Sequence, residues 1–284
     1  MLTTARSLIR EYNLRPKKHL GQCFLEDLNI ITKIVNFVDI KEDEVVIEIG
    51  AGLGLMTELL ARRAQRVIAV EIDSQLADIL RRNLKNCDNV EIVMADIRKF
   101  DFLTVATGKA REKVKVVGNI PYHITSEILF HILENRSFFA EGFLLVQKEV
   151  AERLTAPPST KDYGIPSVTF ALFGQVTKCF FVPASCFYPR PKVDSALIRL
   201  SLEEKPLFEI EKVETFFSLV RAAFAERRKT LINALKHAGF LGGNVMLLKD
   251  LLISAGIDPK RRGETLSVYE YVTLTNRLMD YLVK

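Results

Sequence analysis

The stretch EVVIEIGAGLG, residues 44–54, joins a compact apolar run to a glycine-rich turn. The run over residues 44–49 predicts a buried β-strand, because it is short, continuous and followed at once by Gly50. Residues 55–63 then have the apolar spacing of a helix. A first strand that passes through glycines into a first helix is the opening unit of a doubly wound α/β domain, and its loop can approach a ligand closely.

The glycines of this turn are Gly50, Gly52 and Gly54, and Glu48 stands in front of them. The dinucleotide-binding fingerprint has a different spacing, Gly-x-Gly-x-x-Gly, which cradles a pyrophosphate. The spacing found here is typical of sites for S-adenosylmethionine, which has no pyrophosphate but carries a cationic sulfonium and an amino group. A Glu48 carboxylate close to those cations makes electrostatic sense.

Strand and helix patterns keep alternating as far as about residue 202. Further strands are predicted over residues 66–70, 90–94, 114–118, 142–146, 176–182 and 193–202. This alternation predicts a mainly parallel sheet with helices on both faces. After Pro206 the strand signals stop, and four amphipathic helices are predicted instead. The fold class is therefore α/β, a Rossmann-like sheet over residues 1–204 followed by a small C-terminal all-α domain over residues 205–284.

Four successive predicted strands end in residues that can bind a ligand, namely Gly50, Glu71, Asp96 and Asn119. In an open parallel sheet these carboxyl ends line one crevice. Glu71 lies about 20 positions after the first glycine, as expected for an acid that holds ribose hydroxyls, and Asp96 can accept from an adenine amino group. Ser74 is the expected N-cap of the next helix. The ordered set predicts an S-adenosylmethionine-dependent methyltransferase, and the glycine spacing disfavours the competing class, a nicotinamide dehydrogenase.

The stretch VVGNIPYH, residues 116–123, carries the chemistry expected at the substrate. Asn119 can offer its side-chain oxygen to an N–H, and Ile120 its backbone carbonyl, which Pro121 restricts to extended geometry. Tyr122 can stack on a flat ring. Two acceptors on an exocyclic amine favour a more tetrahedral nitrogen and free its lone pair, so neither a metal nor a strong base is needed. The plain alternative is a strand-to-loop turn with a buried tyrosine.

The composition is that of a globular protein of 284 residues, 48% hydrophobic and 26% charged, with a formal net charge of +5. Mild basicity permits a nucleic-acid partner without requiring one. Basic clusters around Lys17, Arg228 and Arg261 are candidates for phosphate contacts, although such clusters are often only solvated faces. The four cysteines form no Cys-x-x-Cys pair and the four histidines are scattered, so we expect free thiols, a cytoplasmic protein and no metal site. No stretch approaches the roughly 20 apolar residues of a membrane helix.

Four further motifs make the chain resemble the rRNA adenine-N6 dimethyltransferase family over nearly its whole length. They are KKHLGQCFL at residues 17–25, QKEVAER at 147–153, DYG at 162–164 and FYPRPKVDS at 187–195. The first matches the family's Gly-Gln-Asn-Phe-Leu segment, which closes over the cofactor, and so implies cofactor contacts for Cys23 and Leu25. Cys23 replaces the family's asparagine. This change weakens a contact made by the side chain and preserves one made by the backbone.

The resemblance implies a target adenosine that is flipped out of an RNA hairpin, because its amine cannot be reached while the base is stacked. Tyr122 and Phe187 would sandwich the base, while Asn119, Ile120 and Pro121 hold its amine in line with the methyl group of S-adenosylmethionine. Transfer would be a direct displacement without a metal. The plain alternative for Phe187 is an aromatic residue of the core.

Two branches of the family must be distinguished. One, which contains the bacterial KsgA proteins, dimethylates two adjacent adenosines in the hairpin near the 3′ end of 16S rRNA; the other confers erythromycin resistance by modifying 23S rRNA. The motifs FAERRKTL at residues 224–231 and RGETLS at 262–267 resemble the first branch. It implies small-subunit rRNA and the pre-30S particle as partners, a role in subunit biogenesis, an RNA-binding C-terminal domain and a monomer. The alternatives are the resistance branch and an assembly factor that acts mainly by binding.

Overall fold

The computed structural model describes residues 4–104 and 114–282, and the chain divides into two compact units. The first unit comprises residues 1–151 and 177–202, and the second comprises residues 152–176 and 203–284. The sequence predicts a single domain boundary, after residue 204. The chain passes from the first unit into the second at residue 203, next to that position. Contacts also group residues 152–176 with the C-terminal helices, where the Phe173 carbonyl accepts a hydrogen bond from the Glu203 N–H at 2.7 Å.

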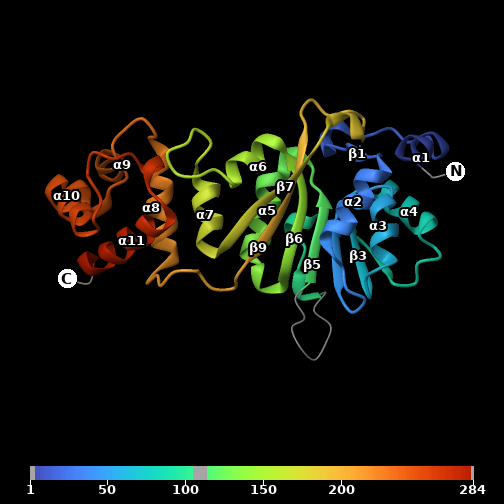
Figure 1. The fold of residues 1–284 in the computed structure, drawn as a ribbon, viewed down its shortest axis with the longest axis horizontal. Helices are drawn as coiled ribbons and strands as arrows, with labels where there is room; N and C mark the ends of the chain where they lie inside the picture. The colour runs from blue at the N-terminus through green and yellow to red at the C-terminus, as the bar shows by residue number, and fades with distance from the viewer. Residues whose placement is uncertain (1–3, 105–113, 283–284) are drawn as a thin grey trace. The chain divides into compact units, whose positions relative to one another are not determined.

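The first unit is built on a seven-stranded sheet with the strand order β4-β3-β2-β5-β6-β9-β7 (Figure 1). The strands are β2 (Val45–Ile49), β3 (Arg66–Glu71), β4 (Val90–Met94), β5 (Val114–Asn119), β6 (Phe139–Gln147), β7 (Gly174–Val182) and β9 (Ser195–Leu202). The five strands from β4 to β6 pair in parallel, and β9 runs antiparallel to β6. The mainly parallel sheet predicted from the sequence is confirmed, with strand ends that differ by a few residues.

Helices cover the sheet in the way that its strand order requires. Helices α2 (Leu28–Val38) and α3 (Leu55–Ala61) pack on one face, where Ile34 and Leu60 join a core that includes Val67 and Phe143. The chain next forms β3, α4 and β4 on one side of β2, and then β5, α5 and β6 on the other. Right-handed crossovers in these two directions place α5 on the face opposite to α3. The remaining helices of this region are α1 (Ala5–Glu11), α4 (Ser74–Asn83), α5 (Thr125–Glu134) and α6 (Lys148–Leu154).

A separate two-stranded sheet joins segments far apart in the chain. Strand β1 (Phe24–Leu25) pairs antiparallel with β8 (Phe187–Tyr188), and Leu25 stands opposite Phe187. Two-residue strands leave no periodic pattern in a sequence, so this pairing was not predicted. It fixes the N-terminal loop against the chain that connects β7 to β9.

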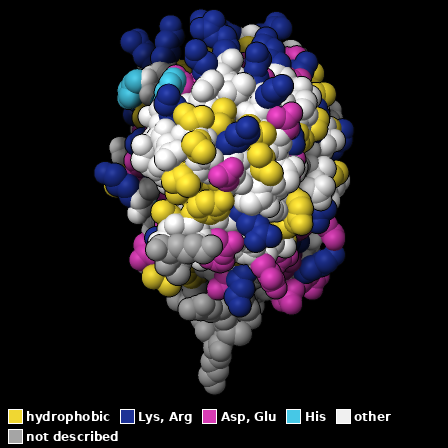
Figure 2. All heavy atoms as spheres, turned by 90° about the vertical axis from the view of Figure 1, so that its left-hand side faces the viewer, with side chains coloured by type: hydrophobic (Ala, Val, Ile, Leu, Met, Phe, Trp, Pro, Cys, Tyr) yellow, Lys and Arg dark blue, Asp and Glu magenta, His cyan; other side chains and the backbone are white. Residues whose placement is uncertain are grey.

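The second unit is helical in its C-terminal part, as predicted. Its helices are α7 (Ile165–Phe173), α8 (Val213–Ala225), α9 (Leu231–His237), α10 (Val245–Ser254) and α11 (Val268–Leu282). Two buried tyrosines tie its loops: the Tyr163 hydroxyl donates to the Leu266 carbonyl at 2.7 Å, and Tyr271 donates to Gly263 at 2.9 Å. Figure 2 faces the side on which α10 lies and shows hydrophobic side chains among lysines and arginines; Met246 of α10 is 76% exposed.

Candidate active site

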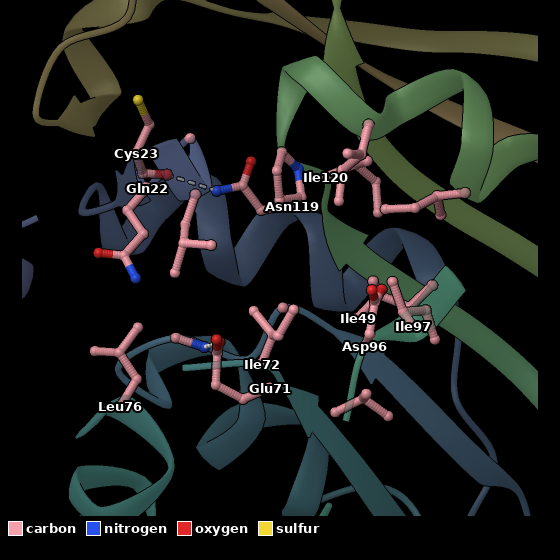
Figure 3. A pocket seen from close by; sticks show the side chains of 18 of the residues that line it. Gln22, Cys23, Ile49, Glu71, Ile72, Leu76, Asp96, Ile97, Asn119 and Ile120 are labelled. Atoms are coloured by element: carbon pink, nitrogen blue, oxygen red, sulfur yellow. Dashed lines mark hydrogen bonds between the residues drawn. The ribbon is translucent and has the colours of Figure 1, made fainter. Parts of the chain in front are cut away.

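A cleft opens where the first four parallel strands of the first unit end at their carboxyl edge (Figure 3). It is an open hollow lined by these strand ends and by the N-terminal loop. Most of the residues predicted from the sequence line it, namely Cys23, Gly50, Gly52, Glu71, Asp96, Asn119, Ile120, Pro121 and Tyr122. Leu25 and Glu48 line a smaller adjoining hollow, which Gly50, Gly52 and Asn119 also border. The expected order of strand ends therefore does bring these side chains together.

Close packing of two strands brings the glycine turn next to the substrate loop. Ile49 at the end of β2 stands opposite Gly118 of β5. A side chain at Gly118 would put its Cβ only 2.7 Å from the Ile49 carbonyl oxygen, so this position requires glycine. Asn119 therefore lies directly beside Gly50, at the junction of the two hollows.

Glu71 is fixed in place by the backbone around it. One carboxylate oxygen accepts from the Gly52 N–H and the other from the Asp73 N–H, both at 2.9 Å. Gly52 makes this bond with a φ of +59°, a conformation that favours glycine. Burial raises the pKa of Glu71, and the two N–H donors act against that shift. The carboxylate is thus held at the edge of the cleft, where it can accept hydrogen bonds from ligand hydroxyls.

Glu48 is a buried carboxyl group whose Oε2 atom has no hydrogen-bond partner among the residues that the structure describes. Burial raises its pKa to about 8, and the nearby charge of Glu71 acts in the same direction. A buried polar atom without a partner is costly, so the site favours a ligand that supplies one. A cation placed in the smaller hollow would do so by stabilising the ionised carboxylate.

Asp96 faces the cleft but is already engaged by Arg98. The Arg98 Nη2 atom lies 2.7 Å from one Asp96 oxygen and its Nε 3.0 Å from the other, while Nη1 reaches Glu127 of α5 at 2.8 Å. This guanidinium holds the pKa of Asp96 below its usual value. The carboxylate therefore stays ionised and fixed in orientation, with its Oδ1 atom also accepting from the Arg98 backbone N–H at 3.0 Å. Arg98 was not predicted from the sequence, although it stands only two residues after Asp96.

The orientation of Asn119 is set by the backbone of the N-terminal loop. Its Nδ2 donates to the Cys23 carbonyl at 2.8 Å, as the dashed line in Figure 3 shows, and this assigns the amide so that Oδ1 remains for another donor. The Cys23 sulfur points away from Asn119 in the same view. Burial raises the pKa of the Cys23 thiol, which keeps it neutral. The contact of residue 23 seen here is therefore made by its carbonyl, which any amino acid can supply.

The two rings expected to sandwich a base have different surroundings. Tyr122 lines the cleft, and its hydroxyl forms a 2.7 Å hydrogen bond with Ser195 Oγ, which fixes the ring at the mouth. Phe187 is instead only 1% exposed and belongs to the core, packed with Leu25 and its neighbours. The β1–β8 pairing draws its side chain inward. The structure thus does not bring Phe187 to the cleft, and in this conformation only Tyr122 is available to a base.

A buried aspartate clamps the N-terminal loop beside the cleft, which the sequence reasoning did not foresee. Asp73 accepts from Lys17 Nζ and from Gln22 Nε2, both at 2.8 Å, and Gln22 Oε1 accepts from the Lys17 N–H. Burial alone would raise the pKa of Asp73, but its hydrogen bonds together hold the pKa below its usual value. Asp73, and not Ser74, is the N-cap of α4, so that earlier expectation is wrong.

The basic residues proposed for RNA contacts fall into two groups. Lys17 pairs with Asp73, and Arg261 pairs with Glu270, so both have structural partners. Arg228 is exposed, and it forms no ion pair with any residue that the structure describes. Lys17 and Arg261 are therefore poorer candidates for phosphate contacts than the sequence implied.

Residues 4–104 and 114–282 show neither a metal-binding cluster nor a membrane helix. In this part of the chain no three His, Cys, Asp or Glu side chains are grouped so that they could hold a metal ion. Within the same residues no helix is both long and apolar enough to cross a membrane. The cleft and its adjoining hollow contain acidic residues that can bind a cationic nucleoside, namely Glu48, Glu71 and Asp96. Beside them, Asn119 and Ile120 offer oxygen acceptors for an aromatic amine. This fold and site define an S-adenosylmethionine-dependent methyltransferase.

Comparison with known proteins identifies the family. The model of the family "Ribosomal RNA adenine dimethylase" matches residues 13–274. The "Ribosomal RNA small subunit methyltransferase A" of Syntrophus aciditrophicus is 46% identical over 277 residues, 98% of this chain and 99% of that protein. The protein of the same name from Moorella thermoacetica is 43% identical, covering 96% of each chain. The chain belongs to the ribosomal RNA adenine dimethylase family.

Solved structures agree with this assignment. The crystal structure of the 23S rRNA methyltransferase ErmE is similar with a TM-score of 0.69 and 30% identity, covering 90% of this chain and 99% of that one. A dimethyladenosine transferase from Plasmodium falciparum has a TM-score of 0.74 and 27% identity, with 88% and 95% covered. The predicted fold class and family are confirmed.

Proposed function

We propose that this protein transfers methyl groups from S-adenosylmethionine to N6 of two adjacent adenosines in the hairpin near the 3′ end of 16S rRNA. The branch is supported by identity: relatives named for the small subunit are 46% and 43% identical, against 30% for ErmE, which is named for 23S rRNA. The chemistry is supported by one observation above all. The Cys23 carbonyl fixes the Asn119 amide so that its oxygen is left for an amine hydrogen.

The residues of the two hollows fit the cofactor. S-adenosylmethionine, when bound, supplies an electrophilic methyl group on a cationic sulfonium. Glu48 has an unpartnered buried oxygen suited to a cationic group, and Glu71 is fixed where ribose hydroxyls can reach it. Asp96 is held ionised for the adenine amino group. Gly50 and Gly52 keep the turn free of side chains, while Cys23 and Leu25 border the site from the N-terminal loop.

At the substrate side, Tyr122 stacks on the flipped adenine, and this contact contributes about 1–3 kcal/mol to binding of the base. Asn119 Oδ1 and the Ile120 carbonyl accept the two amine hydrogens, so the nitrogen lone pair is directed to the methyl group. The Ile120 N–H donates to the Leu145 carbonyl at 3.0 Å, which holds this turn against β6. Pro121 restricts the preceding carbonyl. Much of the rate should come from this alignment.

A role for Phe187 in the sandwich remains part of the proposal, but it requires a change of conformation. The ring would have to leave the core when RNA binds, because it is buried here beside Leu25. Without that change, Phe187 acts by holding the N-terminal loop in place.

The setting of the reaction follows from the same proposal. We expect residues 205–284 to bind RNA, the substrate to be a pre-30S particle in the cytoplasm, and the protein to act as a monomer with a role in subunit biogenesis. Exposed basic residues such as Arg228 support RNA binding by this segment.

The decisive experiment compares methyl transfer from labelled S-adenosylmethionine to unmethylated small subunits and to naked 23S rRNA, with the modified bases mapped. Dimethyladenosine in the 3′ hairpin of 16S rRNA is the expected result. Label only in 23S rRNA would move the protein to the resistance branch. Cofactor binding without any transfer would make an assembly factor the better description.

A further inference from the structure

An exposed aromatic ring lies on β7 with two lysines around it. Phe181 is 48% exposed, which is unusual for a phenylalanine in a strand. The Nζ atoms of Lys178 and Lys148 lie 5.1 and 5.2 Å from the centre of its ring. An accessible π face flanked by ammonium groups has the elements of a platform for an unpaired nucleotide.

A series of contacts links this ring to Tyr122, which lines the cleft. Lys148 follows the last residue of β6, and its N–H donates to the Asp194 carbonyl at 3.0 Å. The next residue, Ser195, is the one that holds the Tyr122 hydroxyl. The ring that stacks on the target base and the exposed ring of Phe181 are thus connected through Ser195, Asp194 and Lys148.

The charge around the ring favours nucleic acid over protein. Residues 177–194 contain three basic side chains, Lys178, Arg190 and Lys192, all exposed. The same segment contains one carboxylate, that of Asp194, and its Oδ1 accepts from the Ala184 N–H at 2.9 Å. Lysine side chains are long and flexible, so their ammonium groups can turn from the ring to a phosphate when a base takes their place.

We propose that Phe181 is the stacking platform for a nucleotide that flanks the target adenosine, with Lys178 and Lys148 at the adjacent phosphate. The inference rests on the proposed function, because it takes RNA as the substrate. It adds a second point of attachment outside the cleft. Holding a neighbouring nucleotide would keep the flipped adenosine in register while its amine is aligned.

The test uses full-length protein with Phe181→Ala, Phe181→Tyr and Phe181→Leu, and with Phe37→Ala as the matched control. Phe37 is 45% exposed and lies on α2. We expect Phe181→Ala to raise KM for small subunits, and Kd for a hairpin RNA, by about 5- to 100-fold, the range of one lost stacking contact. Phe181→Tyr should restore both constants, Phe181→Leu should not, and Phe37→Ala should match the wild type. Cofactor Kd should not change in any of them, and Tm should fall only in Phe37→Ala, because the Phe37 ring packs against Phe143 and Phe180.

Lys178→Ala supplies an independent measurement. For this variant, the slope of log hairpin affinity against log salt concentration should be shallower by about 0.7–0.9, as the loss of one phosphate contact requires. Equal RNA constants for Phe181→Ala and Phe37→Ala would overturn the platform, and so would recovery with Phe181→Leu, which would indicate an apolar protein contact. If wild-type protein fails to methylate small subunits, the proposed function fails instead; the hairpin Kd series still decides on the platform.

Discussion

At the scale of single residues, the most informative contact is the hydrogen bond from Asn119 to the Cys23 carbonyl. An amide can turn over at little cost unless one of its ends is bound. Here the Nδ2 end is bound, so Oδ1 is presented as an acceptor before any substrate arrives. Preorganised polar groups of this kind usually make the largest single contribution to the rate enhancement of an enzyme.

We expect Asn119→Ala to lower kcat for methyl transfer by about 100-fold, equivalent to about 3 kcal/mol of lost transition-state stabilisation. The reason is that one of the two acceptors for the amine hydrogens disappears. Single-turnover rates on small subunits measure this, with cofactor Kd and RNA Kd as controls. Full activity with normal binding would rule out the assignment of Asn119.

Replacement of Cys23 should have little effect. Its carbonyl makes the contact with Asn119, and its sulfur points away. We expect Cys23→Asn and Cys23→Ala to keep kcat and the cofactor Kd within about twofold of the wild type, because neither change removes a carbonyl. A loss of tenfold or more in Cys23→Ala, measured with the same assay, would show that the thiol itself matters.

Glu48 should couple cofactor binding to a proton. Its pKa of about 8 means that the free protein carries the neutral acid at neutral pH. A bound cation favours the carboxylate, so binding should release a proton, and affinity should rise about tenfold per pH unit from about pH 6 to about pH 7.5. Calorimetry in two buffers of different ionisation enthalpy measures the release. Glu48→Gln should bind more weakly and release no proton from this position; an unchanged release in this variant would contradict the assignment.

At the scale of elements, the sequence predicted the strands well because most of them contain a short run of apolar residues between turn residues. It also predicted the common edge at which Glu71, Asp96 and Asn119 meet, because parallel strands share their carboxyl ends. It could not predict the pairing of Leu25 with Phe187 or the clamp on Asp73. Both depend on partners far away in the chain and leave no local period. The sequence left open whether Phe187 stacks on the base or lies in the core, and its burial depends on the same distant pairing.

The clamp on the N-terminal loop should control how long the cofactor stays bound. Gln22 connects the Lys17 N–H to the Asp73 carboxylate through bonds of 2.7 and 2.8 Å. We expect Gln22→Ala to weaken cofactor binding by about tenfold, mainly through faster dissociation, because two hydrogen bonds that hold the loop are lost. Gln75→Ala is the matched control, since Gln75 is exposed and only its backbone N–H contacts Asp73. Equal dissociation rates for the two variants in stopped-flow experiments would show that the clamp has no part in retention.

At the scale of the whole molecule, the proposed function assigns catalysis to the first unit and RNA binding to the second. The cleft lies in the first unit, and the C-terminal part of the second carries exposed basic residues such as Arg228. A net charge of +5 is modest, so affinity for RNA has to come from where the charges are and not from their sum. Arginines with carboxylate partners contribute less, because each already has its charge compensated.

Arg228 and Arg261 therefore differ in a way that a salt titration can measure. Arg228 is exposed, whereas Arg261 pairs with Glu270 of α11 and donates to the Thr265 carbonyl in the turn before this helix. We expect Arg228→Ala to reduce the slope of log RNA affinity against log salt by about 0.7–0.9, with Tm and cofactor Kd unchanged. Arg261→Ala should instead lower Tm and leave the slope nearly as it was. The reverse pattern would mean that the Arg261 pair opens when RNA binds, and that its guanidinium makes the phosphate contact.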